Sequence, residues 1–223
     1  MVYYAYAKYI SADKRYYRYI LAAPDAGTID EWWREASSNV NNSLVRLAPD
    51  FYTWSGGANV WDLAPKIADK IIISLVSNQD SLDTSNLDTF HQPERADVVS
   101  GNSFYIRSKS NPELYWLAKN DQIWATNQGR TRFILRIDGD HGNNNKNVII
   151  ASDEISIVPV GGESKQKYVA VSDDSELVLS GHSCRMYYGD LKRNFLAQGE
   201  TGSSGSALIA KVEGHGEEWE LIQ

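Results

Sequence analysis

Cysteine is almost absent from this chain, which has one in 223 residues. Cys184 has no partner within the chain, which excludes a scaffold stabilised by internal disulfides. Secreted domains built from short strands often carry disulfides, so their absence favours a reducing compartment. Residues 1–6 also lack the basic segment and apolar core that are typical of a signal peptide. We therefore expect a cytoplasmic protein.

Long hydrophobic runs and an excess of basic residues are missing too. The longest apolar stretch, at residues 71–76, is much shorter than the roughly 20 residues that span a bilayer, so no membrane insertion is expected. The chain has 22 Lys and Arg against 29 Asp and Glu, for a net charge of −7. Nucleic-acid binding needs a basic face that neutralises phosphates, so we expect no nucleic-acid partner.

The familiar catalytic and metal-binding motifs are absent as well. The four histidines match neither the H-E-x-x-H pattern nor a zinc spacing with cysteine. His182 and Cys184 are two residues apart, which places them on one strand face but does not make a nucleophile and base pair. The glycine-rich run at residues 202–205 has no lysine after it, as a phosphate loop would. The sequence therefore predicts no enzyme, no cofactor and no metal site.

Aromatic residues are abundant instead, with seven Trp and thirteen Tyr. Such side chains serve both cores and interfaces because each combines an apolar body with a polar tip. Trp32 and Trp33 are adjacent in a predicted helix, where they would point about 100° apart. One of them is predicted to face a partner domain or a second subunit, so a homodimer is one expectation. For this pair and for the block at residues 54–62, core packing and ligand binding remain the alternatives.

A polar, turn-rich segment at about residues 78–97 predicts a domain boundary. Before it, residues 1–95 predict a small α+β domain whose role stays open, with dimerisation as one alternative. Its expected strands are 3–10, 16–22, 44–47, 51–54 and 71–76. One expected helix begins at Thr28, which is the predicted N-cap. A second expected helix covers residues 60–70.

After the boundary, residues 97–223 read as short strands without a helix. One sequence pattern occurs three times: an aromatic residue with a small apolar stretch, then a polar turn, then a second apolar run. The copies are 115–118 with 123–126, 168–171 with 177–179, and 195–197 with 207–210. Twelve strands are expected, beginning at residues 104, 114, 122, 132, 148, 155, 167, 176, 184, 194, 207 and 218.

Three hairpins and twelve strands are what a β-trefoil requires, with six strands in a barrel and six in the hairpins that cap it. Gln122-Ile123-Trp124 is a Q-x-W tripeptide, and Glu217-Glu218-Trp219 is a weaker analogue. On these features, residues 97–223 resemble the β-trefoil lectins of the ricin-B-like and fungal type, with fascin-type trefoils as a related possibility. The expected fold class is mainly β, with a C-terminal β-trefoil barrel and a smaller N-terminal α+β domain.

The resemblance implies a lectin that binds glycans or glycoproteins without catalysis. Sugars are held by aromatic faces and by carboxylate or amide groups that hydrogen-bond to hydroxyls. The first candidate residues are Trp116, Asn120, Asp121, Trp124 and Asn127. The loop that follows the strand at 132 adds Asp138, Asp140, His141 and Asn143.

Both groups of candidate residues have a plainer interpretation. The two tryptophans of the first group could belong to the core, and the polar residues of both groups could form ordinary turns. The second loop also resembles a calcium loop in its closely spaced oxygen donors. It lacks the distal glutamate at EF-hand spacing, so no metal is expected there.

Two other functions stay open. A trefoil presents its loops on a rigid barrel, so it could bind a protein, as a protease inhibitor or a fascin-like cytoskeletal binder. In a third interpretation, the trefoil delivers an N-terminal toxin or enzyme domain, although residues 1–95 carry no recognisable catalytic set.

Overall fold

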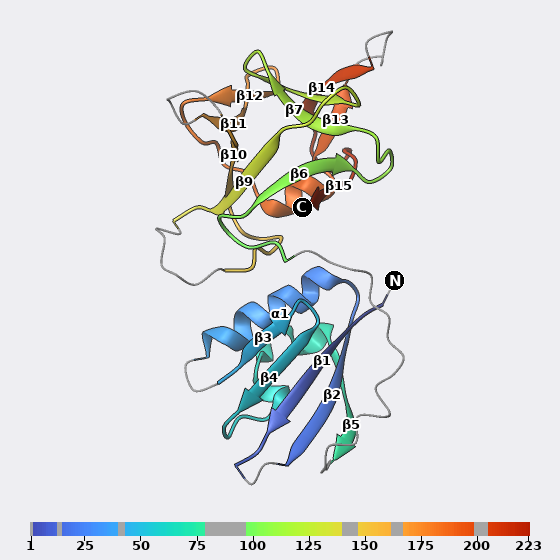
Figure 1. Ribbon diagram of the computed structural model, residues 1–223, viewed down its shortest axis with the longest axis vertical. Coiled ribbons are helices and arrows are strands. Elements are labelled where there is room, and N and C mark those ends of the chain that lie inside the picture. Colours follow the sequence, from blue (N-terminus) through green and yellow to red (C-terminus); the bar gives the residue numbers. More distant parts are fainter. Residues whose placement is uncertain are drawn as a thin grey trace. The chain divides into compact units, whose positions relative to one another are not determined.

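A computed structural model describes residues 2–12, 15–39, 43–78, 97–139, 147–161, 167–198 and 205–223. The fold is mainly β, and the chain divides into two compact units, residues 1–97 and 98–223 (Figure 1). Each unit has an apolar core of its own. None of the helices formed by the described residues has the length and apolar character needed to cross a membrane.

The N-terminal unit is a small mixed sheet with a helix, as the α+β pattern predicts at this coarse level. Its strands are β1 (Tyr3–Ile10), β2 (Tyr16–Ala23), β3 (Val45–Ala48), β4 (Phe51–Ser55) and β5 (Ile72–Asn78). They lie in the order β3-β4-β1-β2-β5. The central strand β1 runs antiparallel to β2 and parallel to β4, which makes the sheet mixed.

Helix α1 (Ala26–Ser38) packs on one face of this sheet because Ile29, Trp32 and Ala36 share one side of the helix and are buried. The expectation that Thr28 caps the helix is wrong. Asp25 is the N-cap, and its Oδ1 accepts a hydrogen bond from the Thr28 backbone N–H at 2.9 Å. A carboxylate at this position satisfies one of the free N–H groups of the first turn.

The helix expected over residues 60–70 is also wrong, because two short 3₁₀ helices replace it. These are η1 (Val60–Asp62) and η2 (Pro65–Lys70). Pro65 has no N–H to donate and disfavours the helical conformation at the preceding residue. Ala64 accordingly has φ −141° and ψ 73°, and the chain starts a new turn at Pro65.

A buried ion pair connects α1 to the sheet. The guanidinium of Arg46, on β3, lies 3.0 Å from the carboxylate of Asp30 on α1 and also pairs with Asp97. It sits above the ring of Tyr52, with Cζ 5.6 Å from the ring centroid. The guanidinium of Arg46 therefore connects the edge strand β3 to α1 and to Asp97 at the end of this unit.

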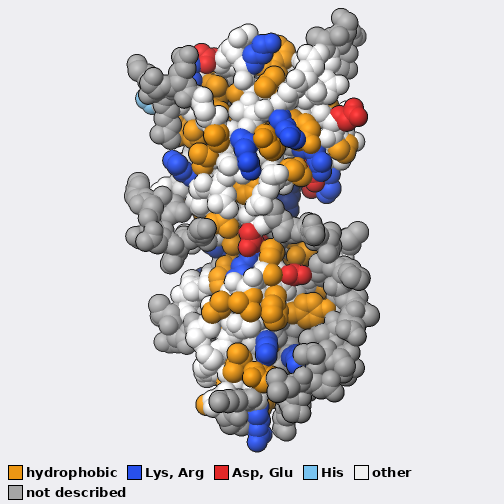
Figure 2. All heavy atoms as spheres, viewed as in Figure 1, with side chains coloured by type: hydrophobic (Ala, Val, Ile, Leu, Met, Phe, Trp, Pro, Cys, Tyr) orange, Lys and Arg blue, Asp and Glu red, His pale blue; other side chains and the backbone are white. Residues whose placement is uncertain are grey.

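The sheet face opposite α1 leaves several large apolar side chains exposed, and no helix of the described residues packs on it. Val45, Phe51 and Ile72 belong to this exposed set, together with Leu47. Alternation along β4 places Phe51 opposite to the buried Tyr52. Figure 2 shows apolar side chains gathered over this unit.

The C-terminal unit is a larger antiparallel sheet. Its strands are β6 (Ser103–Ser108), β7 (Tyr115–Lys119), β8 (Gln122–Thr126), β9 (Arg132–Ile137), β10 (Ile155–Pro159), β11 (Tyr168–Val171), β12 (Leu177–Ser180), β13 (Phe195–Gln198), β14 (Ser206–Lys211) and β15 (Trp219–Ile222). They run in the order β10-β9-β6-β7-β8-β12-β11, with β15 on β6, and with β14 joining β8 to β13. Among the described residues, this ladder does not close into a barrel.

The three hairpins expected from the repeated pattern are all present, as β7–β8, β11–β12 and β13–β14. They also pair with one another. Strand β8 pairs with both β12 and β14, and an isolated bridge joins Glu176 to Ala210 in β14. The three hairpins therefore meet as a group, although their sequences lie far apart.

Two of the expected strands are not formed. At Val148 the chain makes a single bridge to Val99, and after Cys184 it makes a single bridge between Tyr187 and Glu154. A 3₁₀ helix that was not expected, η3 (Tyr188–Lys192), follows directly. The buried carboxylate of Asp190 favours this turn, because it accepts hydrogen bonds from the Tyr187 N–H at 3.0 Å and the Asn194 amide at 2.7 Å.

We predict that Gly216→Ala destabilises the C-terminal unit. A Cβ at this position would lie 2.5 Å from the backbone N and 2.6 Å from the backbone O of Phe195, and backbone yields less easily than a side chain. The expected loss is about 1–3 kcal/mol in the free energy of unfolding, measured by denaturant titration. The control is Gly181→Ala, where a Cβ meets nothing within 4 Å. Equal effects of both substitutions would contradict the prediction.

Candidate functional site

Trp116, the first expected sugar-binding residue, lies in the core of the C-terminal unit, fully buried at 0% exposure. Its ring makes edge-on contacts with Phe133, Phe195 and Trp219 at centroid distances of 6.1, 5.5 and 5.7 Å. A side chain enclosed in this way has no face left for a ligand from solvent. The expectation that Trp116 binds a sugar is therefore wrong, because Trp116 is a core residue.

Asn120 and Asp121 form the tip of the β7–β8 hairpin. Both have left-handed backbones, with φ 53° and 59°, as a two-residue turn of this kind requires. The carboxylate of Asp121 is already engaged in an ion pair with the exposed ammonium of Lys167. This pair matches the plainer interpretation of an ordinary turn.

Trp124 and Asn127 lie away from that tip. Trp124 is half-buried on β8, opposite Leu117 and Leu208 on the neighbouring strands, while Asn127 is exposed just beyond the other end of β8. The five residues of β8 separate Asp121 from Asn127, and these six steps of extended chain span about 20 Å. The structure does not bring the first group of candidates together into one site.

The second candidate group is described only in part. Asp138 is exposed at the end of β9, and its backbone N–H donates to the carbonyl of Glu154 at 2.9 Å. Asp140, His141 and Asn143 lie outside the described residues.

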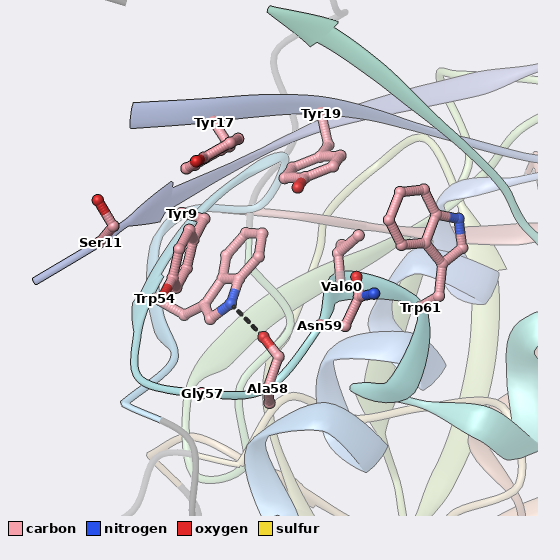
Figure 3. Close-up of a pocket in the computed structure, with 10 residues that line it drawn as sticks. All are labelled: Tyr9, Ser11, Tyr17, Tyr19, Trp54, Gly57, Ala58, Asn59, Val60 and Trp61. Atoms are coloured by element: carbon pink, nitrogen blue, oxygen red, sulfur yellow. Dashed lines mark hydrogen bonds between the residues drawn. The ribbon is translucent and has the colours of Figure 1, made fainter. Parts of the chain in front are cut away.

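A pocket of about 400 Å³ lies in the N-terminal unit, on the side of the sheet that carries α1 (Figure 3). This volume falls in the range of ordinary small-ligand sites. Its walls are aromatic: Tyr9, Tyr17, Tyr19, Trp54 and Trp61. The other lining residues are Ser11, Gly57, Ala58, Asn59 and Val60.

Strand register places the aromatic side chains of the pocket. Tyr9 on β1 stands opposite Tyr17 on β2 and beside Trp54 on β4. Tyr19 lies on the same face as Tyr17 because residues two apart in a strand point the same way. Sheet pairing therefore brings together tyrosines and a tryptophan from three segments of the chain.

A glycine turn supplies the other side of the pocket. Gly56 has φ 117°, a conformation that side chains disfavour, and it turns the chain back after β4. The indole N–H of Trp54 then donates to the carbonyl of Ala58 at 3.2 Å, which holds the returning segment. In Figure 3 the indoles of Trp54 and Trp61 stand on either side of the Asn59 amide.

The aromatic rings contact one another along the pocket wall. Tyr9 lies 5.4 Å from Trp54 and 5.7 Å from Tyr17 between ring centroids. Tyr19 lies 5.7 Å from both Trp54 and Trp61, and it meets Trp61 at 86°. Such mutual packing holds the ring faces in place before any ligand arrives.

No charged side chain is among the residues that line the pocket. Burial raises the pKa of the Tyr19 hydroxyl, and the neighbouring Tyr17 and Tyr9 raise it further. The hydroxyl of Tyr19 therefore stays protonated at neutral pH and can both donate and accept a hydrogen bond. The pocket thus combines apolar ring faces with neutral polar groups, which suits an uncharged ligand with hydroxyls.

Sequence reasoning found part of this pocket. The block at residues 54–62 was expected to serve as core, subunit contact or ligand site, and Trp54 and Trp61 both come from it. The three tyrosines were missed, although Tyr17 and Tyr19 have the alternate spacing of residues on one strand face. Of the helix pair, Trp32 is buried and Trp33 stacks on Tyr52 at 5.6 Å, so both contact their own unit's core.

Within the described ranges, no group of three or more His, Cys, Asp or Glu side chains could hold a metal ion. A comparison of the sequence with models of known protein families finds no match, and a comparison with curated proteins finds none either.

The raised pKa of Tyr19 predicts a loss of stability at alkaline pH. A tyrosine in the unfolded chain ionises near pH 10, and the buried Tyr19 ionises only at a higher pH. The contribution of Tyr19 to the free energy of unfolding is therefore fully present below about pH 10. It is lost as the pH rises from there towards the higher folded pKa. We expect Tyr19→Phe to make the free energy of unfolding less dependent on pH above 10, as followed by denaturant titration. Tyr16→Phe, outside the pocket, is the control and should keep more of the dependence.

Proposed function

We propose that the protein is a lectin, which binds the glycans of glycoconjugates without catalysis, and that its sugar site is the aromatic pocket of the N-terminal unit. The single observation that carries this proposal is the neutral pocket of about 400 Å³ with five aromatic side chains in its walls.

The chemistry of a sugar ring matches these walls. A pyranose presents an apolar C–H face that packs on an aromatic ring, and a rim of hydroxyls that needs hydrogen-bond partners. Trp61 and the half-buried Tyr9 offer ring faces, while the Asn59 amide and the Tyr19 hydroxyl offer partners. Because the rings already pack against one another, little ordering is needed on binding.

We also propose that the C-terminal unit is a β-trefoil. The mutual pairing of the three hairpins supports this, since β8 contacts β12 and β14, and Glu176 bridges to Ala210. The antiparallel ladder through β10, β9, β6 and β15 would be the matching part of the barrel wall. In this proposal, the trefoil is a rigid second unit whose outer surface can carry a binding site of its own.

A second candidate ligand for the pocket is a quaternary ammonium group. Several aromatic rings around a neutral cavity can hold such a cation through their negative faces. The amide and hydroxyl groups of the rim favour the sugar, because a quaternary ammonium makes no hydrogen bonds with them. Choline therefore belongs among the test ligands.

We predict that Trp61→Ala abolishes glycan binding or weakens it about tenfold or more, because it removes one aromatic wall. Trp61 is 47% exposed, so the substitution should leave the fold intact. Binding is measured on a glycan array and by calorimetry with the best glycan found. The matched control is Phe51→Ala, a 37% exposed aromatic on the opposite sheet face.

The same measurement on Asp121→Ala tests the hairpin tip that the sequence favoured. Loss of glycan binding in Asp121→Ala but not in Trp61→Ala would refute the pocket as the sugar site. Binding of choline instead of any glycan would favour the second candidate.

A further inference from the structure

Arginine and tyrosine side chains form a cluster on the C-terminal unit. Its members lie on or beside three adjacent strands: Tyr105 on β6, Tyr115 on β7, Arg132 on β9, and Arg130 just before β9. Figure 2 shows basic side chains among apolar ones on the side of this unit where Figure 1 shows β6 and β9. In a chain with a net charge of −7, such a basic cluster is unexpected.

Arg130 is held between two aromatic rings. Its Cζ lies 4.3 Å from the ring centroid of Tyr105 and 5.4 Å from that of Tyr115. It is exposed, while both tyrosines are half-buried. A guanidinium that packs on rings leaves its N–H edge free to meet a ligand, and its orientation is already restricted.

Arg132 approaches the same tyrosine. Its Cζ lies 5.1 Å from the Tyr105 centroid, and its Nη2 donates to the carbonyl of Ser103 at 3.4 Å. Both guanidinium groups therefore contact the ring of Tyr105. No carboxylate within the described part of the chain pairs with Arg130 or Arg132.

A third arginine of this face is already neutralised. Arg107 donates from Nε to the Glu220 carboxylate at 2.9 Å, and this hydrogen bond is the main reason why its pKa is raised. Glu220 and Glu218 on or next to β15 would repel a polyanion such as a nucleic acid. The charge pattern suits a ligand with a single negative group rather than a chain of phosphates.

We propose that Arg130 and Arg132, on the rings of Tyr105 and Tyr115, bind the carboxylate of an acidic sugar such as a uronic acid. The planar fork of arginine matches a carboxylate in two-point hydrogen bonding. The two tyrosine rings hold the guanidinium groups in place for this contact. This site lies in the other unit and shares no residue with the aromatic pocket, so each proposal can fail without the other.

The test compares sugar pairs that differ only in the carboxylate: glucuronate with glucose, and galacturonate with galactose. Each sugar is titrated into the full chain by ligand-observed NMR, at low and physiological salt. We expect each uronate to bind about tenfold more tightly than its neutral partner, as charge-assisted hydrogen bonds predict. The preference should fall as salt rises, because the site is exposed.

Substitutions then locate the site. Arg130→Gln and Arg132→Gln should each weaken uronate binding about tenfold, and Arg130→Lys should have a smaller effect because it keeps the charge but loses the fork. Arg185→Gln is the matched control: it is 71% exposed, pairs with Glu154 and lies 5.4 Å from the Tyr187 ring. It should bind uronates like the unmodified chain.

The Trp61→Ala background separates this proposal from the proposed pocket. Uronate binding should persist there even if neutral glycans no longer bind. The inference is overturned if uronates bind no more tightly than their neutral partners, or if the double variant of Arg130 and Arg132 binds uronates unchanged. Tighter binding of a single-stranded oligonucleotide than of uronate at physiological salt would also overturn it.

Discussion

The packing of Trp116 is the interaction on which the rest of the C-terminal unit depends. Its ring touches Phe133, Phe195 and Trp219, which come from β9, β13 and β15. The indole N–H of Trp219 in turn donates to the carbonyl of Phe195 at 3.0 Å. Because buried apolar side chains fill the described interior of this unit, the site proposed for it lies on an outer surface. The arginine and tyrosine cluster is one such outer surface.

The N-terminal unit uses aromatic side chains differently. Its core is completed by α1 near one end of the sheet, through Trp32 and its neighbours. At the other end, the turn at Gly56 carries the chain back over β1 and β2 and leaves a cavity between them. The less buried rings of Tyr9, Tyr17 and Trp61 therefore line a pocket beside the buried ring of Trp54. Aromatic residues pack in the core of both units, and in the N-terminal unit they also line a pocket.

Local patterns predicted much of the secondary structure. Alternation predicted β1 and β2 almost to the residue, and the repeated pattern predicted the three hairpins. The errors came from specific side chains: Pro65 divided an expected helix, and Asp25 replaced Thr28 as the cap. Of the expected site residues, Trp116 was the clearest error. Alternation predicts that neighbouring residues face opposite ways, but it does not say which way is inward.

The sequence by itself determined a mainly β chain with a mixed first part and three hairpins, because turns and hydrophobic alternation are local properties. Only the tertiary structure decided which aromatic and polar residues meet. Tyr9 and Trp54 become neighbours through a parallel pairing, and Tyr105 and Arg132 through an antiparallel one. Strand register sets such contacts, and register depends on packing between segments that are far apart in the chain. Both proposed binding surfaces arise from this long-range pairing.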